Sequence, residues 1–263
     1  DNVLEWVEIS GGGDGDWANV YIRSTGGVAM RHVTSTNSAT FGLVVESDAA
    51  SLNDFSENTL TGNSQGAVET FLNQVVNLDN ASTYSPNTEE GVFIINGSAN
   101  TSGTWPAIDA PLIFNASLNI FEDIVVEAGA ELVFEENARL NVEADSSLKA
   151  VGTEAAPIRL RGAEPTPGFW QGLVFISSSG NNVLEWVEIS DGGDGNWSNV
   201  YIRRTGSATF QNTTSTNSST CGVFVENNGF TTPTAGAGLC EEVRVSSNAT
   251  ADICLEENEI RCP

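Results

Sequence analysis

The sequence predicts an all-β chain in which short strands wind into a solenoid of parallel coils. Three observations favour this fold class. Apolar runs recur roughly every 8–12 positions, a spacing typical of short strands separated by turns. Two-residue Asn-Gly loops of the kind that close antiparallel hairpins are scarce. A long stretch is repeated without a gap 180 positions later, which a solenoid absorbs easily because each coil contacts only its neighbours.

The duplication relates residues 2–46 to residues 182–226, which are identical at 30 of 45 aligned positions. Each copy reads as the run LEWVEIS, a GGDG turn and the run NVYIR. At about 20–25 residues per coil, the 180-residue period corresponds to about eight coils. We therefore expect both copies to be coil strands that fill the same interior, with Trp6 and Trp186 in the core.

The region between the copies shows the same pattern of short apolar runs separated by polar residues and glycines. The stretch 66–81 is ambiguous, because its apolar residues also fit helical spacing. We expect a strand there, since the strand-like units ENTLTGN and GVFIING flank it, with a short helix as the alternative. Asparagines follow several of the apolar runs, and stacked coils can align such residues into amide ladders at bends: Asn37, Asn58, Asn63, Asn212 and Asn217.

The run from Trp105 to Ser190 resembles the secreted bacterial right-handed parallel β-helix repeat proteins of pectate-lyase-like architecture. The matching pieces are TWPAIDAPLIF, IVVEAGAELVFEENARLNVEADSSLKAVGTEAAPIRLRG and PGFWQGLVFISSSGNNVLEWVEIS. They follow the family's order of a glycine turn, an L-x-V-x-F-like strand, a GsLxAxGT strand, a PIxF strand and a WxGIxF strand. The resemblance implies a right-handed parallel β-helix, a secreted bacterial protein and a member without catalysis, because these motifs describe coil geometry.

All four cysteines lie in the last 43 residues: Cys221, Cys240, Cys254 and Cys262. An even number clustered at one end predicts two disulfides and an oxidising compartment, with three possible pairings. We therefore expect a parallel β-helix over residues 1–226 and a disulfide-stapled C-terminal cap over residues 227–263. Such a cap would cover the open strand edges of the last coil. The N-terminal coil carries no equivalent cap.

The charge balance limits the partners. The chain has 35 acidic and 10 basic residues, for a formal net charge of −25, which disfavours nucleic acid, anionic lipid and polyuronates. No apolar run reaches the ~18–20 residues that a membrane-spanning helix needs. The sequence opens on Asp1 inside the repeated motif with no signal peptide in view. We expect a mature form or part of a longer protein, located extracellularly or at the cell surface.

No catalytic motif stands out, and we expect a protein that is not an enzyme, with no catalytic residue to name. A lyase base would need a cation such as Arg159 or Arg161, but these two are expected to face outward and balance nearby glutamates. The polygalacturonase-like motifs NTD, DD, GHG and RIK are absent. His32 is replaced by Asn212 in the second copy, which argues against a general acid there.

The two glycine turns, GGGDGDW (11–17) and DGGDGNW (191–197), predict the candidate sites. Ca²⁺ takes six to eight oxygen ligands, and glycine lets backbone carbonyls converge with carboxylates. The candidate calcium ligands are therefore Asp14, Asp16, Asp191 and Asp194; no other cofactor is expected. Trp17 and Trp197 follow the turns and are candidates for stacking on sugar rings.

Three functional hypotheses remain open. The first is an extracellular structural or adhesive β-helix protein, either a segment of a surface stalk or a subunit that stacks head-to-tail into a filament. The alternative is a carbohydrate-binding module, and a second alternative is a polysaccharide lyase or hydrolase. The expected partners are accordingly further copies of the chain or neutral extracellular glycans.

Overall fold

The computed structural model describes residues 2–233, 238–256, 258–260 and 262, without the side chains of 258–260. In this part of the chain the fold is an all-β parallel solenoid of about 9 turns, as the sequence predicts. Among the strand pairs described for these residues, the pair β29 (Ala251–Leu255) and β30 (Asn258–Ile260) is antiparallel, while the others run parallel. The chain divides into two compact units, which are described separately.

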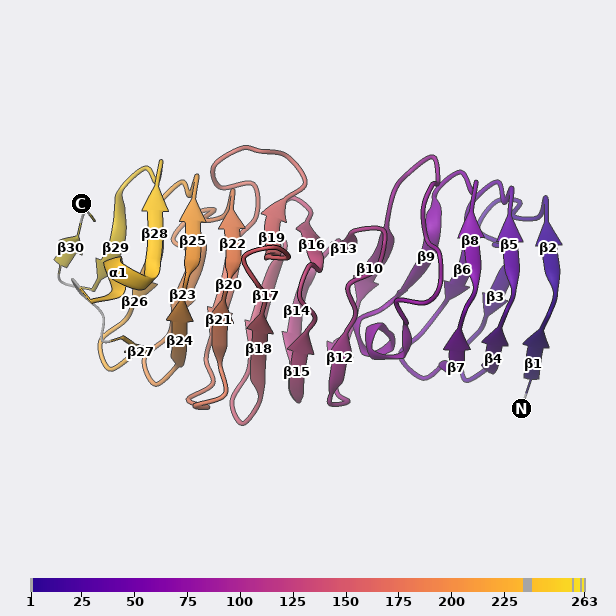
Figure 1. Cartoon of the computed structure of the whole chain (residues 1–263), viewed down its shortest axis with the longest axis horizontal. Helices are drawn as coiled ribbons and strands as arrows, with labels where there is room; N and C mark the ends of the chain where they lie inside the picture. The colour runs from indigo at the N-terminus through magenta and orange to yellow at the C-terminus, as the bar shows by residue number, and fades with distance from the viewer. Residues whose placement is uncertain (1, 234–237, 257, 261, 263) are drawn as a thin grey trace. The chain divides into compact units, whose positions relative to one another are not determined.

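Unit 1 comprises Asp1–Gly97 and Trp105–Ile113 and contains the first copy of the duplication. Its strands lie in three parallel sheets, and each of the first three turns contributes one strand to each sheet (Figure 1). The first sheet holds β1 (Asn2–Glu5), β4 (Gly27–Arg31) and β7 (Ser51–Ser56). The second holds β2 (Glu8–Ser10), β5 (Thr34–Thr36) and β8 (Thr59–Thr61). The third holds, in order, β3 (Val20–Ile22), β6 (Phe41–Val45), β9 (Gly66–Phe71) and β10 (Val92–Asn96).

The ambiguous stretch 66–81 divides between the two alternatives. Its first part is strand β9, and its second part is the 3₁₀ helix η1 (Leu72–Asn77). Gln74 of η1 is buried, and its side chain makes the hydrogen bonds that a neighbouring strand would otherwise make. Its Nε2 donates to the carbonyl of Ala50 at 2.8 Å, and its Oε1 accepts from the backbone amide of Leu52 at 3.3 Å. Leu72 and Val75 are fully buried, so the helix fills the interior of the coil.

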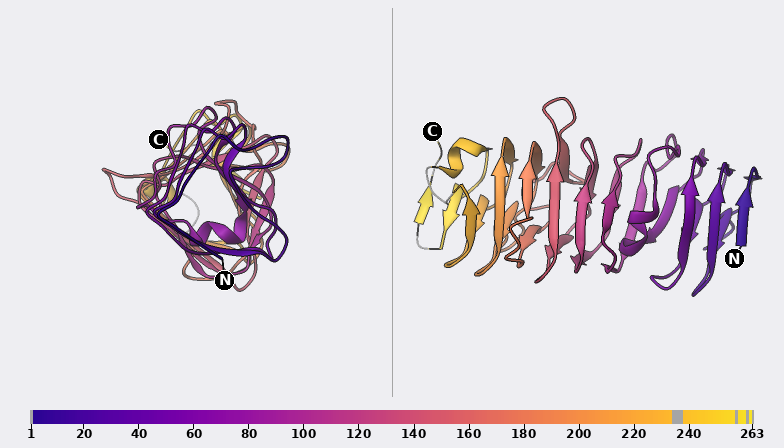
Figure 2. Two further views of the ribbon diagram at one scale, coloured as in Figure 1. Left: turned by 90° about the vertical axis from the view of Figure 1, so that its right-hand side faces the viewer. Right: turned by 60° about the horizontal axis from the view of Figure 1, so that its bottom comes forward.

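Unit 2 comprises Ser98–Thr104 and Phe114–Pro263 and contains the second copy. Strands β12 (Gly103–Trp105) and β13 (Leu112–Phe114) lie at the division between the units. Within unit 2 the successive strands of each sheet again stack side by side (Figure 2). The longest sheet holds β11 (Ser98–Ala99), β14 (Ser117–Ile120), β17 (Arg139–Val142), β20 (Gly172–Phe175), β23 (Val200–Ile202), β26 (Cys221–Val225), β29 and β30.

The other two sheets of unit 2 follow the same stacking. One holds β15 (Asp123–Val126), β18 (Ser147–Val151), β21 (Val183–Glu185), β24 (Ser207–Gln211) and β27 (Phe230–Thr232). The other holds β16 (Glu131–Phe134), β19 (Ile158–Gly162), β22 (Val187–Ser190), β25 (Thr213–Thr216) and β28 (Val243–Ser246). A short helix, α1 (Leu239–Glu242), precedes β28.

The interior of unit 2 is built from columns of apolar side chains in register. Parallel strands place equivalent residues above one another, so one aliphatic pattern repeated in each coil gives a continuous core. One fully buried column runs through Leu118, Leu140, Leu173, Val200, Val223 and Ile253. A second is aromatic: Phe134 stacks on Phe114 at 4.9 Å and on Trp170 at 4.0 Å between ring centroids.

The C-terminal segment continues the solenoid further than expected. Strand β27 pairs in parallel with β24, β28 with β25 and β29 with β26, so these strands add another turn to the three sheets. The expected boundary at residue 226 therefore falls inside the solenoid, in the connection between β26 and β27, and α1 and the antiparallel β30 are the described parts that depart from the coil. The two predicted disulfides are confirmed, and they pair Cys221 with Cys254 and Cys240 with Cys262.

The expectation that Trp6 and Trp186 lie in the core is wrong. Both residues occupy the left-handed backbone region, with φ of 56° and 51°, at the bend between two strands. A left-handed residue interrupts the alternation of inward and outward side chains, so the indole leaves the interior. Trp6 is 75% exposed and stacks on the His32 ring at 4.0 Å, while Trp186 is half-buried.

The bend asparagines serve two different purposes. Asn37, Asn212 and Asn217 have positive φ and turn the backbone, a conformation that asparagine tolerates better than most residues. Asn63 instead lies in the expected ladder between neighbouring coils: its side-chain amide donates to Asn87 Oδ1 at 3.1 Å. Asn58 is buried and closes a bend through bonds to backbone groups.

Candidate functional site

A buried asparagine anchors the glycine turn in the second copy. Asn199 Oδ1 accepts from the amide of Gly192 at 2.7 Å. Its Nδ2 donates to the carbonyl of Thr216 at 2.7 Å and to Ser215 Oγ at 3.1 Å. These bonds tie the turn to the next coil, so the strand that follows the turn has a fixed position. The first copy repeats the arrangement with Asn19, Gly12, Thr36 and Ser35, at 2.8, 2.9 and 3.2 Å.

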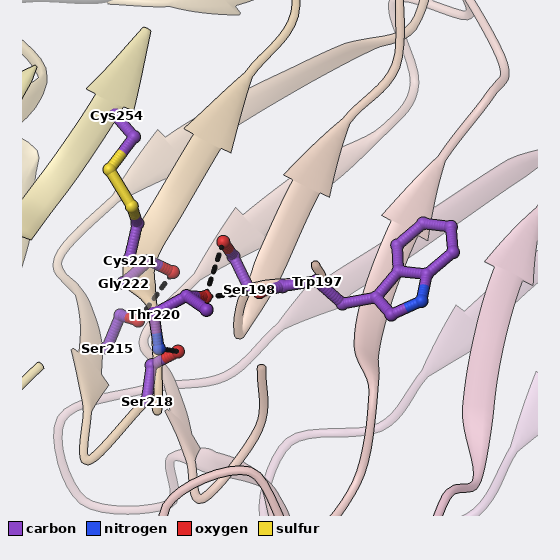
Figure 3. Close-up of a disulfide and its surroundings, with 8 residues drawn as sticks. All are labelled: Trp197, Ser198, Ser215, Ser218, Thr220, Cys221, Gly222 and Cys254. Atoms are coloured by element: carbon purple, nitrogen blue, oxygen red, sulfur yellow. Dashed lines mark hydrogen bonds between the residues drawn. A yellow bond between two sulfur atoms is a disulfide. The ribbon is translucent and has the colours of Figure 1, made fainter. Parts of the chain in front are cut away.

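Hydroxyl groups of the next coil hold the end of the same turn. Thr220 Oγ1 donates to the carbonyl of Trp197 and lies 3.1 Å from Ser198 Oγ (Figure 3). Ser215 Oγ donates to the carbonyl of Gly222 at 2.9 Å. In the first copy Thr40 makes the corresponding bond to the carbonyl of Trp17.

A groove of about 780 Å³ lies beside this turn in the second copy. Its lining combines an aromatic row with hydroxyl groups and the disulfide Cys221–Cys254. The ring of Tyr201 stacks on Phe224 at 4.7 Å with an interplanar angle of 14°, and it meets Trp197 edge to face at 5.2 Å. Phe224 also packs against the buried cluster around the disulfide. One end of the aromatic row therefore packs against a covalent crosslink between neighbouring coils.

The indole of Trp197 contacts two side chains, Tyr201 and Arg139. Its side chain points away from the disulfide (Figure 3). The guanidinium of Arg139 lies 4.5 Å from the centroid of the indole, within the range of a cation–π contact. Burial, and then the nearby charge of Arg203, lowers the pKa of Arg139. Trp197 is half-buried, so part of the indole lines the groove while the rest is covered.

The first copy has the same groove in a smaller form, of about 300 Å³. Its lining residues within the duplicated segment all have counterparts 180 positions later that line the groove of the second copy. These are Gly15, Asp16, Tyr21, Thr40, Phe41 and Val44 in the first copy, and Gly195, Asn196, Tyr201, Thr220, Cys221 and Phe224 in the second. The groove is thus a property of the repeated sequence.

The two grooves differ in charge and in aromatic content. The first contains the carboxylates of Asp16 and Glu69, and burial raises the pKa of Glu69. In the second groove the counterpart of Asp16 is the amide of Asn196, and the position opposite Phe224 on the next coil is Cys254. In the first copy the position opposite Val44 on the next coil is Glu69. The second groove is therefore larger, less charged and more aromatic than the first.

The tyrosine of each groove is tied to a glutamate on the next coil. Tyr201 donates its hydroxyl proton to Glu226 Oε1 at 2.9 Å. Burial, followed by the bond to Glu226, raises the pKa of Tyr201 to about 12. Tyr21 donates to Glu46 at 3.4 Å, and burial raises its pKa as well. Both phenols are thus neutral at physiological pH and oriented by a carboxylate.

The candidate calcium ligands occupy different surroundings. Asp14 and Asp16 lie exposed in the first turn. Asp191 is buried, and its two carboxylate oxygens already accept from Ser190 Oγ at 2.6 Å and Asn217 Nδ2 at 2.7 Å. Among the residues that the structure describes, no group of three or more His, Cys, Asp and Glu side chains is placed to hold a metal ion. Calcium binding stays a prediction.

Trp17, the other glycan candidate, is 51% exposed. Its ring centroid lies 4.9 Å from that of Tyr21, and the guanidinium of Arg23 lies 5.4 Å from the indole. The first groove lies beside Trp17 and is lined by residues of the glycine turn and by residues in or directly before strands β3, β6 and β9. Trp17 therefore presents an aromatic surface next to the first groove, whereas Trp197 forms part of the second groove.

Sequence reasoning missed the tyrosines and Phe224. The signal for the tyrosines is the repeated run NVYIR, in which Val and Ile point inward and Tyr must point outward on a strand. The same alternation in β26 places Phe224 between the inward residues Val223 and Val225, so it predicts an outward-facing aromatic ring there. The cations behave as expected: Arg159 pairs with Glu188 at 2.9 Å and Arg161 with Glu131 at 2.7 Å between nitrogen and oxygen.

Comparison of the chain with known protein families, with curated proteins and with solved structures finds no match. Among the described residues, no helix has both the length and the apolar character needed to cross a membrane.

Proposed function

We propose that this chain is an extracellular β-solenoid that binds neutral glycans in the groove of its second repeat copy. The observation that carries the proposal is the groove of about 780 Å³ beside Trp197, with Tyr201 and Phe224 stacked along it. The C–H faces of sugar rings pack on aromatic side chains, and sugar hydroxyls need neutral donors and acceptors at the rim. Asn196 and Thr220 supply such groups.

The charge of the chain supports a neutral ligand over an acidic one. The formal net charge of −25 repels polyuronates and sulfated glycans at long range. Glu256 is the charged residue among those that line the second groove, and its carboxylate accepts from the amide of Asn227 at 2.8 Å. An anionic sugar would bring its charge next to this carboxylate, and the described residues of the lining include no cation to balance it.

The test is calorimetric titration of the chain with neutral oligosaccharides from β-glucan, mannan and xylan, with oligouronates for comparison. We expect one of the neutral series to bind. Replacing Phe224 with the valine that the first copy carries (Phe224→Val) removes one stacked ring, and should weaken that binding by about tenfold. The matched control is Val44→Phe in the first copy, which leaves the second groove intact. Binding to none of the neutral series, or equal binding by Phe224→Val, would contradict the proposal.

A structural or adhesive role as a surface stalk is the second candidate. It is supported by the solenoid body itself, whose coils stack by parallel pairing, and by two disulfides that favour an oxidising compartment. The head-to-tail filament is the weaker form of this proposal. Strand β30 pairs antiparallel with the outer edge of β29, so that edge is already occupied and is not open to a strand of a second copy. Sedimentation velocity over a wide concentration range separates them: a stalk segment stays monomeric, whereas a filament subunit lengthens.

The resemblance of residues 105–190 to secreted bacterial β-helix repeat proteins agrees with both candidates, since it concerns coil geometry. We propose secretion on the same grounds, and expression with and without export to an oxidising compartment tests it. Protein that folds with four free thiols and equal stability would remove this support.

A further inference from the structure

Glu69 stands in a column of aromatic and aliphatic side chains on the outer face of the third sheet of unit 1. In the parallel register Tyr21 of β3 lies opposite Val44 of β6, and Val44 lies opposite Glu69 of β9. Phe93 of β10 lies opposite Glu69 on the other side. This glutamate is therefore flanked by an apolar residue on each neighbouring coil, and it is half-buried there.

The carboxylate of Glu69 has no partner in the described part of the chain. No described residue makes a hydrogen bond or an ion pair with it, and burial raises its pKa. Glu46, which follows β6, differs: its carboxylate accepts from the Tyr21 hydroxyl at 3.4 Å and pairs with Arg23 at 3.5 Å. A half-buried negative charge without a partner is unfavourable, so a ligand with a positive charge would supply the interaction that the chain does not.

Glu69 belongs to the lining of the first groove, of about 300 Å³. The same lining holds a second carboxylate, that of Asp16, which is exposed in the glycine turn. The described residues of the lining include no Lys, Arg or His. The groove therefore carries two negative charges without a balancing cation, in a chain whose formal net charge of −25 attracts cations at long range.

Aromatic rings make this groove suited to an organic cation. The ring of Phe41, in the lining, meets the ring of Phe93 edge to face at 5.5 Å between centroids. The ring of Tyr21, also in the lining, lies 4.9 Å from that of Trp17. Ring faces attract ammonium groups in addition to the attraction of a carboxylate. A metal ion is the poorer occupant, because Ca²⁺ takes six to eight oxygen ligands and the described residues hold no group of three or more ligating side chains.

The second copy shows that the charge belongs to the first groove alone. Asn196 takes the place of Asp16 there. The position that Glu69 occupies on the next coil is held by Cys254, which is part of a disulfide. Both grooves share the turn and the strands, so the two carboxylates determine which ligand charge the first groove accepts.

The surroundings of the first groove fit a sugar ring that carries the ammonium group. Trp17, beside the groove, is 51% exposed, and its indole offers a flat face to the C–H side of a ring. The exposed side-chain amide of Gln65, in the lining, offers both donors and an acceptor to ring hydroxyls. These groups favour an amino sugar over an ammonium ion that has no ring.

We infer that the groove of the first copy binds an amino sugar whose free ammonium group pairs with Glu69 and Asp16. The inference does not rest on the binding of neutral glycans, because it concerns a different groove, in the other unit, and depends on two carboxylates that the second groove lacks at the corresponding positions.

The test is calorimetric titration at neutral pH with glucosamine oligomers, whose amines are free, and with N-acetylglucosamine oligomers of the same length, whose amines are blocked. The glucosamine series should bind. Glu69→Gln keeps the shape of the side chain and removes its charge, so it should weaken that binding by at least about tenfold. The matched control is Glu89→Gln, which removes the same charge from an exposed bend of unit 1 and should leave the binding unchanged.

Two further measurements separate lost binding from lost folding. The melting temperature of Glu69→Gln at neutral pH should not fall below that of the unchanged chain, because the substitution removes a half-buried charge. Hydrogen exchange should slow in residues 40–45 and 65–71 when the glucosamine oligomers are added, and should not change there with the acetylated ones.

Each outcome decides the inference. Binding of the glucosamine series that depends on Glu69 and not on Glu89 supports it. Absence of that binding, or equal binding by Glu69→Gln, overturns it. Equal weakening by Glu89→Gln also overturns it, since the net charge alone would then attract the amines. A lysine oligopeptide that competes as strongly as the oligomers overturns it as well, because the ring would then contribute nothing. The neutral series and Phe224→Val report on the second groove, so either proposal can fail while the other stands.

Discussion

The duplicated asparagine allows one side chain to be removed from two versions of the same turn. In Asn199→Ala the amide of Gly192 and the hydroxyl of Ser215 each lose a partner at a buried site, and the carbonyl of Thr216 loses one at a partly buried site. A hydrogen bond contributes about 1 kcal/mol net, and a buried group left unsatisfied costs more. The expected loss in the free energy of unfolding is therefore about 3–4 kcal/mol. Asn19→Ala removes the same bonds from the first copy, where the bond to Gly12 is exposed and the bonds to Thr36 and Ser35 are partly buried. Water replaces more of what is lost there, and the expected loss is about 1–2 kcal/mol.

Urea unfolding of both variants, combined with hydrogen exchange at the amides of Gly12 and Gly192, measures the difference. Exchange at Gly192 should accelerate strongly in Asn199→Ala, while exchange at Gly12 should accelerate less in Asn19→Ala, because the bond that it loses lies at an exposed site. An equal loss in the two variants, or a larger one in Asn19→Ala, would show that the buried asparagine does not hold the turn as described.

Two further predictions concern pH. Burial raises the pKa of Glu69, so the folded state binds this proton more tightly and its stability falls as pH rises from the unfolded value of ~4.3 through the folded one. Glu69→Gln should therefore raise the melting temperature at neutral pH and leave it unchanged at about pH 3; a lower melting temperature at neutral pH would contradict the burial of the charge. The raised pKa of Tyr201, about 12, stabilises the fold below the unfolded value of ~10, and this contribution is lost as pH rises through about 12. Tyr201→Phe should unfold less steeply with pH between these values in an alkaline titration followed by circular dichroism, and an unchanged profile would count against the described environment of the phenol.

The fold could be predicted because the solenoid repeats one environment. Aliphatic residues such as Leu173 and Val200 recur at the same inward position in each coil, and a gapless duplication can be accommodated in that geometry. The clustered cysteines likewise predicted two disulfides, but their pairing depends on which coil edges meet, and that is set by register. The stretch 66–81 carried both strand and helix signals because it contains both elements in succession.

The candidate site was predicted less well, for two physical reasons. Trp6 and Trp186 lie within apolar runs, but a left-handed residue at the bend takes them off the inward side, and alternation alone does not reveal that. The groove depends on residues from successive coils, such as Tyr201, Phe224 and Cys254, which are brought together by stacking. The tryptophans that follow the glycine turns were named as candidates from the sequence and stay a prediction, whereas the tyrosines that line both grooves were not named.

The central claim, that the second copy of the turn binds a neutral glycan, is tested most directly by hydrogen-exchange mass spectrometry with and without the oligosaccharide that binds. The account predicts slower exchange in residues 195–201 and 220–226 and no change in the duplicated residues 15–21 and 40–46. Protection confined to the first copy, or to neither, would contradict it.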